Sequence, residues 1–296
     1  MDIVDSQVHL GPGGIEELLA TMDALGIKAA LLDEFWVGAS GRSMPSYGIP
    51  VGNGTVRRRI TPTAELASLM HPDRFSYLYW LLDRRDPEMQ SLIRLTRDAT
   101  HGRALRIIPG LSKVELSALT SGGYDDVFKM AADCGLPIFV AIPGNVPALR
   151  PSIEKFRTVT FIIDHCGMPF TTDMISRMGL SDQFPGTGGD GNEAEFEKVL
   201  RLADLPNVAL KWAHAQGLFG ISRYPYRGLR PFLKSALNAF GAERVMWAAD
   251  ASIVSMWSGE NWAQLLFWLM DNPDLSESER ANLLGGTVRK ILNWPL

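Results

Sequence analysis

The chain has 296 residues, of which 46% are hydrophobic, and a formal net charge of −4. These values fit a globular α/β protein and exclude a strongly basic surface for nucleic acid. Two cysteines, Cys134 and Cys166, are too few for a disulfide framework and are typical of a reducing compartment. We find no pattern of a signal peptide or of a membrane span. We therefore expect a cytoplasmic protein that acts on a small molecule, without nucleic-acid or membrane partners.

Short runs of β-branched and apolar residues recur along the chain and predict eight β-strands. In chain order they cover residues 3–9, 29–34, 75–82, 104–108, 137–142, 158–165, 208–212 and 245–249. Amphipathic segments between them predict helices at residues 15–25, 63–70, 87–96, 125–134, 193–203 and 229–240. Strands that alternate with helices form parallel sheets. Eight such units without a break in composition predict a single-domain TIM (β/α)8 barrel over residues 1–296.

Two long segments interrupt this alternation, at residues 38–62 and 167–192. Both follow the C-terminal ends of predicted strands, where the active sites of TIM barrels form. We interpret them as walls or lids over the site, and the alternative is that they are ordinary surface loops. The glycine-rich part of the second segment lacks the sequence context of a phosphate-binding loop.

The first predicted strand ends in Gln7 and His9, whose side chains point to the same face because they are two residues apart. Two histidines at this spacing would be a strong signal for a metal site. Here the first position is an amide, which donates and accepts hydrogen bonds but cannot act as a base. We predict that Gln7 contacts the substrate.

Asp250 and His165 end two further strands and are therefore expected at the same rim of the barrel as His9. A carboxylate at this place can act as a general base for water or as a metal ligand, and the alternative for Asp250 is a helix N-cap. His165 and His9 are candidates to polarise a carbonyl group or stabilise an oxyanion, and the alternative is a hydrogen-bonded core histidine. We favour the catalytic interpretation for all three residues.

Other predicted strands also end in or near ionisable residues, namely Asp33, Glu34, Asp83 and Asp164. Lys211 lies in the seventh strand, and we predict that it faces the interior, pairs with a carboxylate and contributes to substrate binding. His214 either reaches the pocket or lies on the loop. Cys166 adjoins His165, and because neighbours on a strand face opposite ways we interpret it as a packing residue.

Four tryptophans fall at or beyond strand ends, namely Trp36, Trp80, Trp212 and Trp257, and one interpretation is that they are core residues. Together they could line an aromatic pocket for a planar, partly apolar substrate, and we predict contacts from the first three. A substrate carboxylate would need a cation, and the sequence does not choose among the four arginines of the rim loops, Arg42, Arg57, Arg58 and Arg223.

Four short motifs occur in order along almost the whole chain. They are Asp5-Ser6-Gln7-Val8-His9, Asp164-His165-Cys166-Gly167-Met168-Pro169, Met246-Trp247-Ala248-Ala249-Asp250 and Leu283-Leu284-Gly285-Gly286-Thr287-Val288-Arg289. Together they resemble the amidohydrolase superfamily, and within it the amidohydrolase-2, or amidohydrolase-related, group. The resemblance implies a barrel with its active site at the ends of strands 1, 6 and 8, and oligomers are common among the proteins it resembles.

The departures from the family pattern concern metal binding. Many metal-dependent members carry a histidine where this chain has Gln7, and another at the end of strand 5, where it has Ala141. A stable divalent site needs three or more good ligands. His9 and Asp250 remain, with His165 nearby, and we expect at most weak binding of a metal such as zinc. The pattern resembles the metal-independent lactonase branch, which includes 2-pyrone-4,6-dicarboxylate lactonase, so no cofactor is expected to be required.

The predicted function is therefore hydrolysis of a lactone or activated ester. Asp250 would activate water, and His9 and His165 would polarise the carbonyl group. One alternative is a metal-dependent decarboxylase or hydrolase of an aromatic acid, which the predicted aromatic rim suits. The other is a barrel that binds a small molecule without turnover, which the replacements at Gln7 and Ala141 permit.

Overall fold

A computed structural model describes residues 1–10, 14–33, 49–50, 57–58, 63–177, 193–221, 223–251 and 259–295. Eight parallel strands follow one another around a barrel in the order β1-β2-β5-β6-β7-β8-β9-β10. Their bounds are β1 Val4–Val8, β2 Ala29–Asp33, β5 Phe75–Trp80, β6 Gly102–Ile107, β7 Ile138–Val140, β8 Phe161–Ile163, β9 Val208–Trp212 and β10 Val245–Trp247. All eight predicted strands are confirmed, and so is the TIM barrel.

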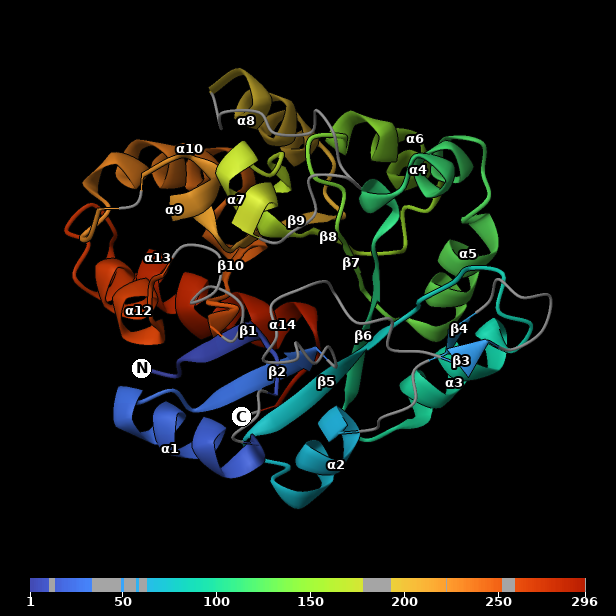
Figure 1. Cartoon of the computed structure of the whole chain (residues 1–296), viewed down its shortest axis with the longest axis horizontal. Helices are drawn as coiled ribbons and strands as arrows, with labels where there is room; N and C mark the ends of the chain where they lie inside the picture. The colour runs from blue at the N-terminus through green and yellow to red at the C-terminus, as the bar shows by residue number, and fades with distance from the viewer. Residues whose placement is uncertain are drawn as a thin grey trace.

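Helices surround the ring of strands (Figure 1). They are α1 Gly14–Leu25, α2 Thr63–Met70, α3 Met89–Asp98, α4 Lys113–Thr120, α5 Asp125–Cys134, α6 Arg150–Lys155, α7 Thr172–Arg177, α8 Glu193–Leu200, α9 Ala215–Leu218, α10 Arg230–Phe240, α12 Trp262–Met270, α13 Glu277–Ala281 and α14 Thr287–Ile291. The six predicted helices correspond to α1, α2, α3, α5, α8 and α10. None of the described helices is long and apolar enough to cross a membrane.

The two predicted insertions lie largely outside the described residues. Within the first, the short strands β3 Ile49–Pro50 and β4 Arg57–Arg58 pair antiparallel. Within the second, residues 167–177 are described and contain helix α7. The role of these segments as walls or lids therefore stays a prediction.

A layer of apolar side chains fills the inside of the barrel. Each strand contributes one residue to this cluster, namely Val4, Ala29, Leu31, Leu78, Ala104, Phe139, Ile162, Ala209 and Met246, with a second one from β2. Val288 and Leu292 from the C-terminal end of the chain join the same cluster. Because inward side chains recur every second residue, the next inward positions toward the C-terminal ends are Asp33, Arg106, Asp164 and Lys211. This apolar layer, here called the apolar floor, therefore lies directly below a polar layer that is nearer the C-terminal ends of the strands.

The first and last strands meet through long-range hydrogen bonds. The Ser6 hydroxyl donates to the Trp247 carbonyl oxygen at 2.7 Å, and the Asp250 N–H donates to the Gln7 carbonyl oxygen at 3.1 Å. An irregularity in the register of β1 lies between Asp5 and Val8. It changes the inward phase of the strand, so that Val4 belongs to the apolar floor while Gln7 reaches the polar layer.

Gly285 allows the C-terminal part of the chain to approach β1 closely. A Cβ atom at this position would lie 2.0 Å from the Asp2 carbonyl oxygen, whereas at Gly286 the nearest atom would be the Asn282 Oδ1, at 3.0 Å. Gly285→Ala is expected to lower the free energy of unfolding by about 1–3 kcal/mol, because backbone must move. Urea denaturation checks this, with Gly286→Ala as the matched control. Equal effects of the two changes would contradict the close-approach argument.

Candidate active site

Arg106 ties together two carboxylates in the polar layer. It forms an ion pair with Asp33, and its Nε donates to Asp164 Oδ2 at 2.8 Å. All three side chains are buried. Burial alone would raise the pKa of Asp164, but the positive charges of Arg106 and Lys211 outweigh it and lower that pKa. Arg106 of β6 and Lys211 of β9 therefore keep the carboxylate of Asp164 ionised.

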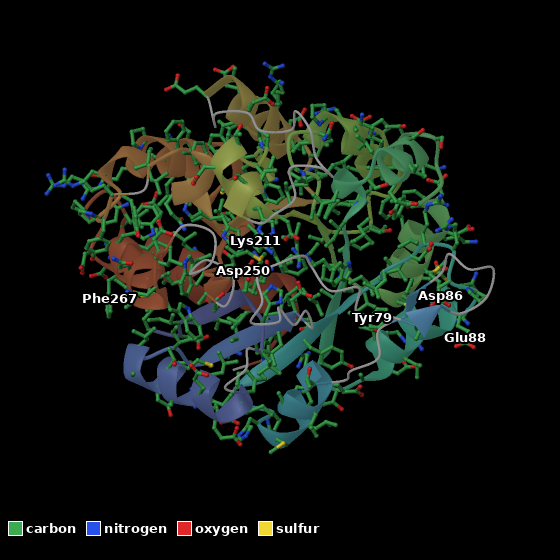
Figure 2. The ribbon with its side chains drawn as sticks, viewed as in Figure 1. Tyr79, Asp86, Glu88, Lys211, Asp250 and Phe267 are labelled. Carbon is green, nitrogen blue, oxygen red and sulfur yellow. The ribbon has the colours of Figure 1, made fainter. Side chains whose placement is uncertain are left out.

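Lys211 is fully buried in the middle of the barrel, near Asp250 (Figure 2). Its ammonium group contacts the carboxylate of Asp164 and donates to Oε1 of Gln7. It also lies 5.1 Å above the ring of Phe139, which belongs to the apolar floor. Burial lowers the pKa of Lys211, and the charge of Asp164 opposes this shift. The predicted inward orientation of Lys211 and its pairing with a carboxylate are confirmed.

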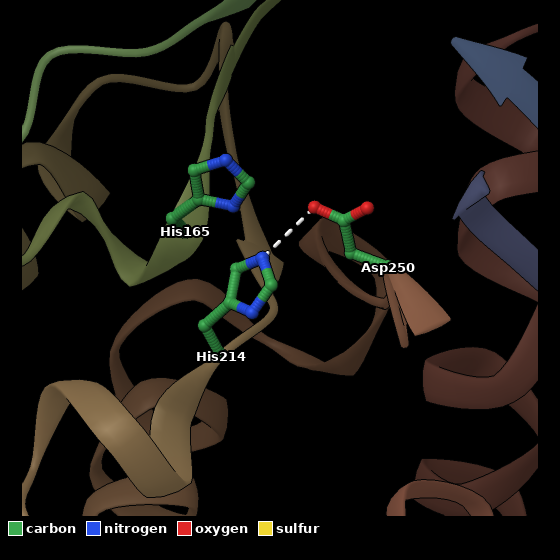
Figure 3. Close-up of side chains that lie close together, drawn as sticks. All are labelled: His165, His214 and Asp250. Carbon is green, nitrogen blue, oxygen red and sulfur yellow. Dashed lines mark hydrogen bonds and ion pairs between the residues drawn. The ribbon is translucent and has the colours of Figure 1, made fainter. Parts of the chain in front are cut away.

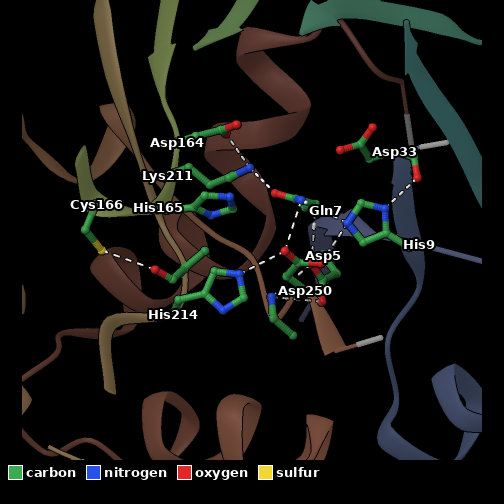
Figure 4. A network of polar contacts seen from close by, with 12 residues as sticks. Asp5, Gln7, His9, Asp33, Asp164, His165, Cys166, Lys211, His214 and Asp250 are labelled. Carbon is green, nitrogen blue, oxygen red and sulfur yellow. Dashed lines mark hydrogen bonds and ion pairs between the residues drawn. The ribbon is translucent and has the colours of Figure 1, made fainter. Parts of the chain in front are cut away.

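The amide of Gln7 has a defined orientation because of its partners. Lys211 only donates, so Oε1 faces the ammonium group, and Nε2 faces Asp250 Oδ2 at 3.1 Å. The same Nε2 lies 3.2 Å from His9 Nε2, as expected for two side chains on one face of a strand. Figure 4 shows the resulting chain of contacts from Asp164 through Lys211 and Gln7 to Asp250.

Asp250 is the meeting point of the site. Its Oδ1 lies 3.0 Å from His9 Nε2, and its Oδ2 lies 2.9 Å from His214 Nε2. The side chain is buried. Burial would raise the pKa of Asp250, but the contacts with His9 and His214 outweigh it and hold this pKa well below its usual range. Of the two interpretations left open for His214, the structure favours the one in which it reaches the pocket.

His9 links Asp250 to the second strand. Its Nδ1 lies 2.8 Å from the carbonyl oxygen of Asp33, which only accepts, so Nδ1 carries a proton. Burial lowers the pKa of His9, but the negative charge of Asp250 more than compensates, and the pKa is raised above its ordinary value. The contact with Asp250 therefore favours the protonated form of His9.

His165 presents its Nδ1 nitrogen to the same space. Its Nε2 lies 3.2 Å from Nη2 of Arg106, which only donates, so Nε2 accepts and Nδ1 carries the proton of a neutral ring. Burial and the nearby charge of Lys211 lower its pKa well below 6.5. Nδ1 is buried and has no hydrogen-bond partner within the described parts of the chain. Figure 3 shows the ring facing Asp250 and His214.

The backbone differs from the sequence prediction around His165. Strand β8 ends at Ile163, and a turn at His165–Gly167 follows, in which His165 and Cys166 have φ values of 51° and 53°. The two side chains are thus separated by a turn rather than by strand alternation. Burial raises the pKa of Cys166 to about 12, and its Sγ contacts the Ala213 carbonyl oxygen at 3.5 Å. The thiol is a packing group, as predicted.

Asp5 holds the backbone next to Asp250 in place. Its carboxylate accepts hydrogen bonds from the N–H groups of Gln7 and Ala249 and, at 2.8 Å, from the Trp262 indole. Burial nevertheless raises the pKa of Asp5 to about 7. Ala249 directly precedes Asp250, so these bonds fix the backbone that carries the central carboxylate.

One group of side chains has the donor types of a metal site. Single ligand atoms of His165, His214 and Asp250 lie within 4.8 Å of one another. Two imidazoles and a carboxylate are suitable ligands for zinc, so the group is compatible with a divalent ion. Two observations oppose tight binding. The proton on His165 Nδ1 occupies the lone pair that would face the ion, and the ammonium group of Lys211 brings a positive charge nearby.

The structure does not test the predicted substrate contacts of the tryptophans and the loop arginines. Trp36, Trp257 and Arg42 lie outside the described residues, and the side chains of Arg57 and Arg58 do too. Trp80 is partly buried at the end of β5. Trp212 packs against Phe196 and Phe219 in the outer apolar layer, since it follows the inward Lys211. Arg223 is exposed. Substrate contacts from these residues stay predictions.

Sequence reasoning missed Arg106 and the supporting role of Asp5. Arg106 lies two residues after Ala104 in a predicted strand, so strand alternation alone places both on one face. An arginine on the inner face of a barrel strand was therefore a usable signal. Asp5 was quoted only as part of a motif, and its partners Ala249 and Trp262 are too distant in sequence to be inferred from spacing.

Solved structures with the same fold cover nearly the whole chain. An amidohydrolase from Burkholderia multivorans with bound zinc has 16% identity and a TM-score of 0.72, with 100% of both chains covered. A protein named as a 2-pyrone-4,6-dicarboxylic acid hydrolase from Pseudomonas putida has 17% identity and a TM-score of 0.65, with 100% of this chain and 99% of that chain covered. The 5-carboxyvanillate decarboxylase of Sphingomonas paucimobilis has 15% identity and a TM-score of 0.59, with 99% of each chain covered.

At these identities the structural likenesses show the fold alone, whereas the comparison with family models shows the family. A search of curated proteins finds no match. The model of the amidohydrolase family Amidohydro_2 matches residues 51–294, which is well over half of the chain and includes His165, Lys211, His214 and Asp250. The chain therefore belongs to the amidohydrolase family of hydrolytic enzymes.

Proposed function

We propose that the protein hydrolyses a lactone or an activated ester at the site formed by Asp250, His165 and His9. The observation that carries this proposal is the buried Nδ1–H of His165, which has no hydrogen-bond partner among the described residues and faces the region of an ionised Asp250. An unpaired donor in a buried site costs free energy unless a ligand uses it. A carbonyl oxygen that becomes an oxyanion is the ligand that such a donor stabilises best.

In the proposed reaction, Asp250 accepts a proton from a water molecule as the water oxygen attacks the carbonyl carbon. The carbonyl π electrons move to oxygen, which His165 Nδ1–H stabilises by a hydrogen bond, and His9 adds positive charge beside it. The tetrahedral intermediate then collapses, the bond to the leaving oxygen breaks, and the proton on Asp250 passes to that oxygen. Gln7 and Lys211 hold the carboxylate side of the site in place.

The electrostatics of Asp250 favour an activated substrate. A pKa well below its usual range keeps the carboxylate ionised at neutral pH but also makes it a weak base. A weak base suits a substrate whose leaving oxygen departs easily and whose carbonyl group is already electrophilic. Lactones of enols and aryl esters have these properties, whereas unactivated amides lack them. The proposal therefore names lactones and activated esters rather than amides.

No cofactor is required in this proposal. The proton on His165 Nδ1 and the charge of Lys211 speak against a tightly held ion, as described above. If a divalent ion does bind, His214 and Asp250 are its best ligands, with His9 or His165 completing the set. Such an ion would supply a Lewis acid for the carbonyl oxygen.

A second candidate function is a metal-dependent decarboxylation or hydrolysis of an aromatic acid. The ligand set of His165, His214 and Asp250 is the specific observation in its favour. The fold shared with a decarboxylase is compatible with it. A non-catalytic binding barrel finds no such support, because the family assignment is that of an enzyme.

The two enzymatic functions are separated by one panel of substrates. Lactones, including 2-pyrone-4,6-dicarboxylate, aryl esters and hydroxylated aromatic acids are incubated with protein before and after chelation. The proposal expects hydrolysis of at least one lactone or ester, unchanged by chelation. Release of carbon dioxide from an aromatic acid that depends on added metal, without lactone or ester hydrolysis, would support the second candidate instead.

The role of His165 gives a further prediction. His165→Ala is expected to lower kcat by about 10²-fold or more with little change in KM, because the lost hydrogen bond acts on the oxyanion and not on the ground state. Steady-state kinetics on the best substrate of the panel measure this. His71→Ala is the matched control, since His71 packs at the edge of Phe75 in the outer layer. A kcat of His165→Ala within twofold of that of His71→Ala would count against the proposed donor.

A further inference from the structure

Lys211, the buried lysine of β9, lies next to side chains that could bind a metal ion. The ammonium group of Lys211 is fully buried, contacts the carboxylate of Asp164 and donates to Oε1 of Gln7. Arg106 lies on the other side of Asp164 and contacts His165. Two cations, from β6 and β9, thus stand next to the potential ligands at the centre of the barrel.

Both cations also engage atoms that a metal ion would need. In Gln7 only Oε1 has lone pairs for a hard cation, and Lys211 occupies that oxygen, which leaves the amide N–H groups facing Asp250. In His165, Arg106 takes the lone pair of Nε2, so the nitrogen that faces Asp250 carries a proton. A ligand nitrogen must be free of its proton. The side chains of Gln7 and His165 therefore direct N–H donors, and not lone pairs, toward the centre of the site.

The balance of charges in the site also disfavours a bound divalent ion. Arg106 and Lys211 balance the two carboxylates Asp33 and Asp164, with which they form ion pairs. The third carboxylate, Asp250, lies between His9 and His214. In a site from which water is largely excluded, a divalent ion near Asp250 would be repelled by the ammonium group of Lys211. The attraction left for the ion comes mainly from Asp250.

From these contacts we propose that Lys211 is a resident cation that keeps divalent metals out of the site, with Arg106 supporting it by fixing His165. Lys211 acts through Gln7 and Asp250 and is a positioning residue. Its charge takes the place that a divalent ion would otherwise fill, and it holds the Gln7 amide with its donors toward Asp250. The inference concerns metal affinity and does not depend on which substrate the site hydrolyses.

The test compares zinc affinity of the full chain by isothermal titration, confirmed by metal analysis after dialysis against buffered free zinc. Lys211→Met removes the charge and releases Oε1 of Gln7, and we expect it to bind one zinc ion per chain with a Kd lower by about tenfold or more than that of the wild type. Lys211→Arg keeps the charge and is expected to bind zinc as weakly as the wild type. Lys198→Met removes the charge of a lysine that pairs with Glu195 on α8, and serves as the matched control.

Equal zinc affinities of the wild type and Lys211→Met would overturn the proposal, and so would a tight, stoichiometric zinc site in the wild type. Circular dichroism establishes that each variant is folded. If Lys211→Met does not fold, Lys211→Gln replaces it, because its amide still donates to Asp164 while the charge is lost. Failure of lactone hydrolysis in all proteins would reject the proposed function but leave these zinc affinities, and hence this inference, intact.

Discussion

Asp250→Asn is expected to lower kcat for the best lactone or ester by about 10³-fold while the protein stays folded. Asparagine has the shape of aspartate but cannot accept the proton of the attacking water, and general bases contribute about 10²–10⁴-fold to rates. The exchange also removes the negative charge that faces His9 and His214 at 3.0 and 2.9 Å. Binding of the substrate should be affected less than turnover, because the proposed role of Asp250 lies in the transition state.

The comparison requires a control for the loss of a carboxylate. Asp204→Asn provides it, because Asp204 is an exposed residue that pairs with Arg150 on the outer surface. Steady-state kinetics and circular dichroism of both variants against the wild type make the measurement. Turnover by Asp250→Asn within a few-fold of that by Asp204→Asn would remove Asp250 from the role of general base.

Arg106→Met is expected to lower the free energy of unfolding by about 3–5 kcal/mol, the largest effect on stability that we predict. Removing this guanidinium takes away the ion-pair partner of Asp33 and one of the two cations that pair with Asp164, the other being Lys211. Both carboxylates are buried. A buried charge that loses its partner cannot regain hydration in the folded state, whereas in the unfolded state it can. Urea denaturation at pH 7 measures the difference.

Two further variants separate charge from packing in this prediction. Arg150→Met removes a guanidinium whose partners Glu154 and Asp204 are exposed, and its effect should be much smaller because water screens such pairs. Arg106→Met combined with Asp33→Asn removes one uncompensated charge and should recover part of the lost stability. A double variant no more stable than Arg106→Met alone would show that lost packing, and not the buried charge, accounts for the effect.

The sequence predicted the barrel well because its signals are local. The strands are short apolar runs bounded by turns, and helix α5 has a strong amphipathic pattern and the predicted bounds. Short helices such as α6 and α9 lack enough residues for a clear period, and α12 is apolar around much of its circumference. These elements are stabilised by packing on the barrel, which a single segment does not reveal.

The candidate site was predicted in part for a related reason. Strand alternation placed Gln7 with His9, and the positions of strand ends gathered His9, His165 and Asp250 at one rim. The pairing of Lys211 with Gln7 was not predictable, because it depends on the irregular register of β1. The tautomer of His165 likewise follows from Arg106, which lies 59 residues earlier in the chain. Such contacts are set by the closed barrel and not by spacing in the sequence.

In the proposed function, Asp250 and His165 hydrolyse a lactone or activated ester without a required metal. The most direct measurement is the hydrolysis rate of protein that has been chelated and dialysed, with its metal content determined on the same sample. We predict full turnover with a metal content far below one ion per chain, and no gain when zinc is added back. Turnover that disappears on chelation and returns in proportion to bound zinc would contradict it.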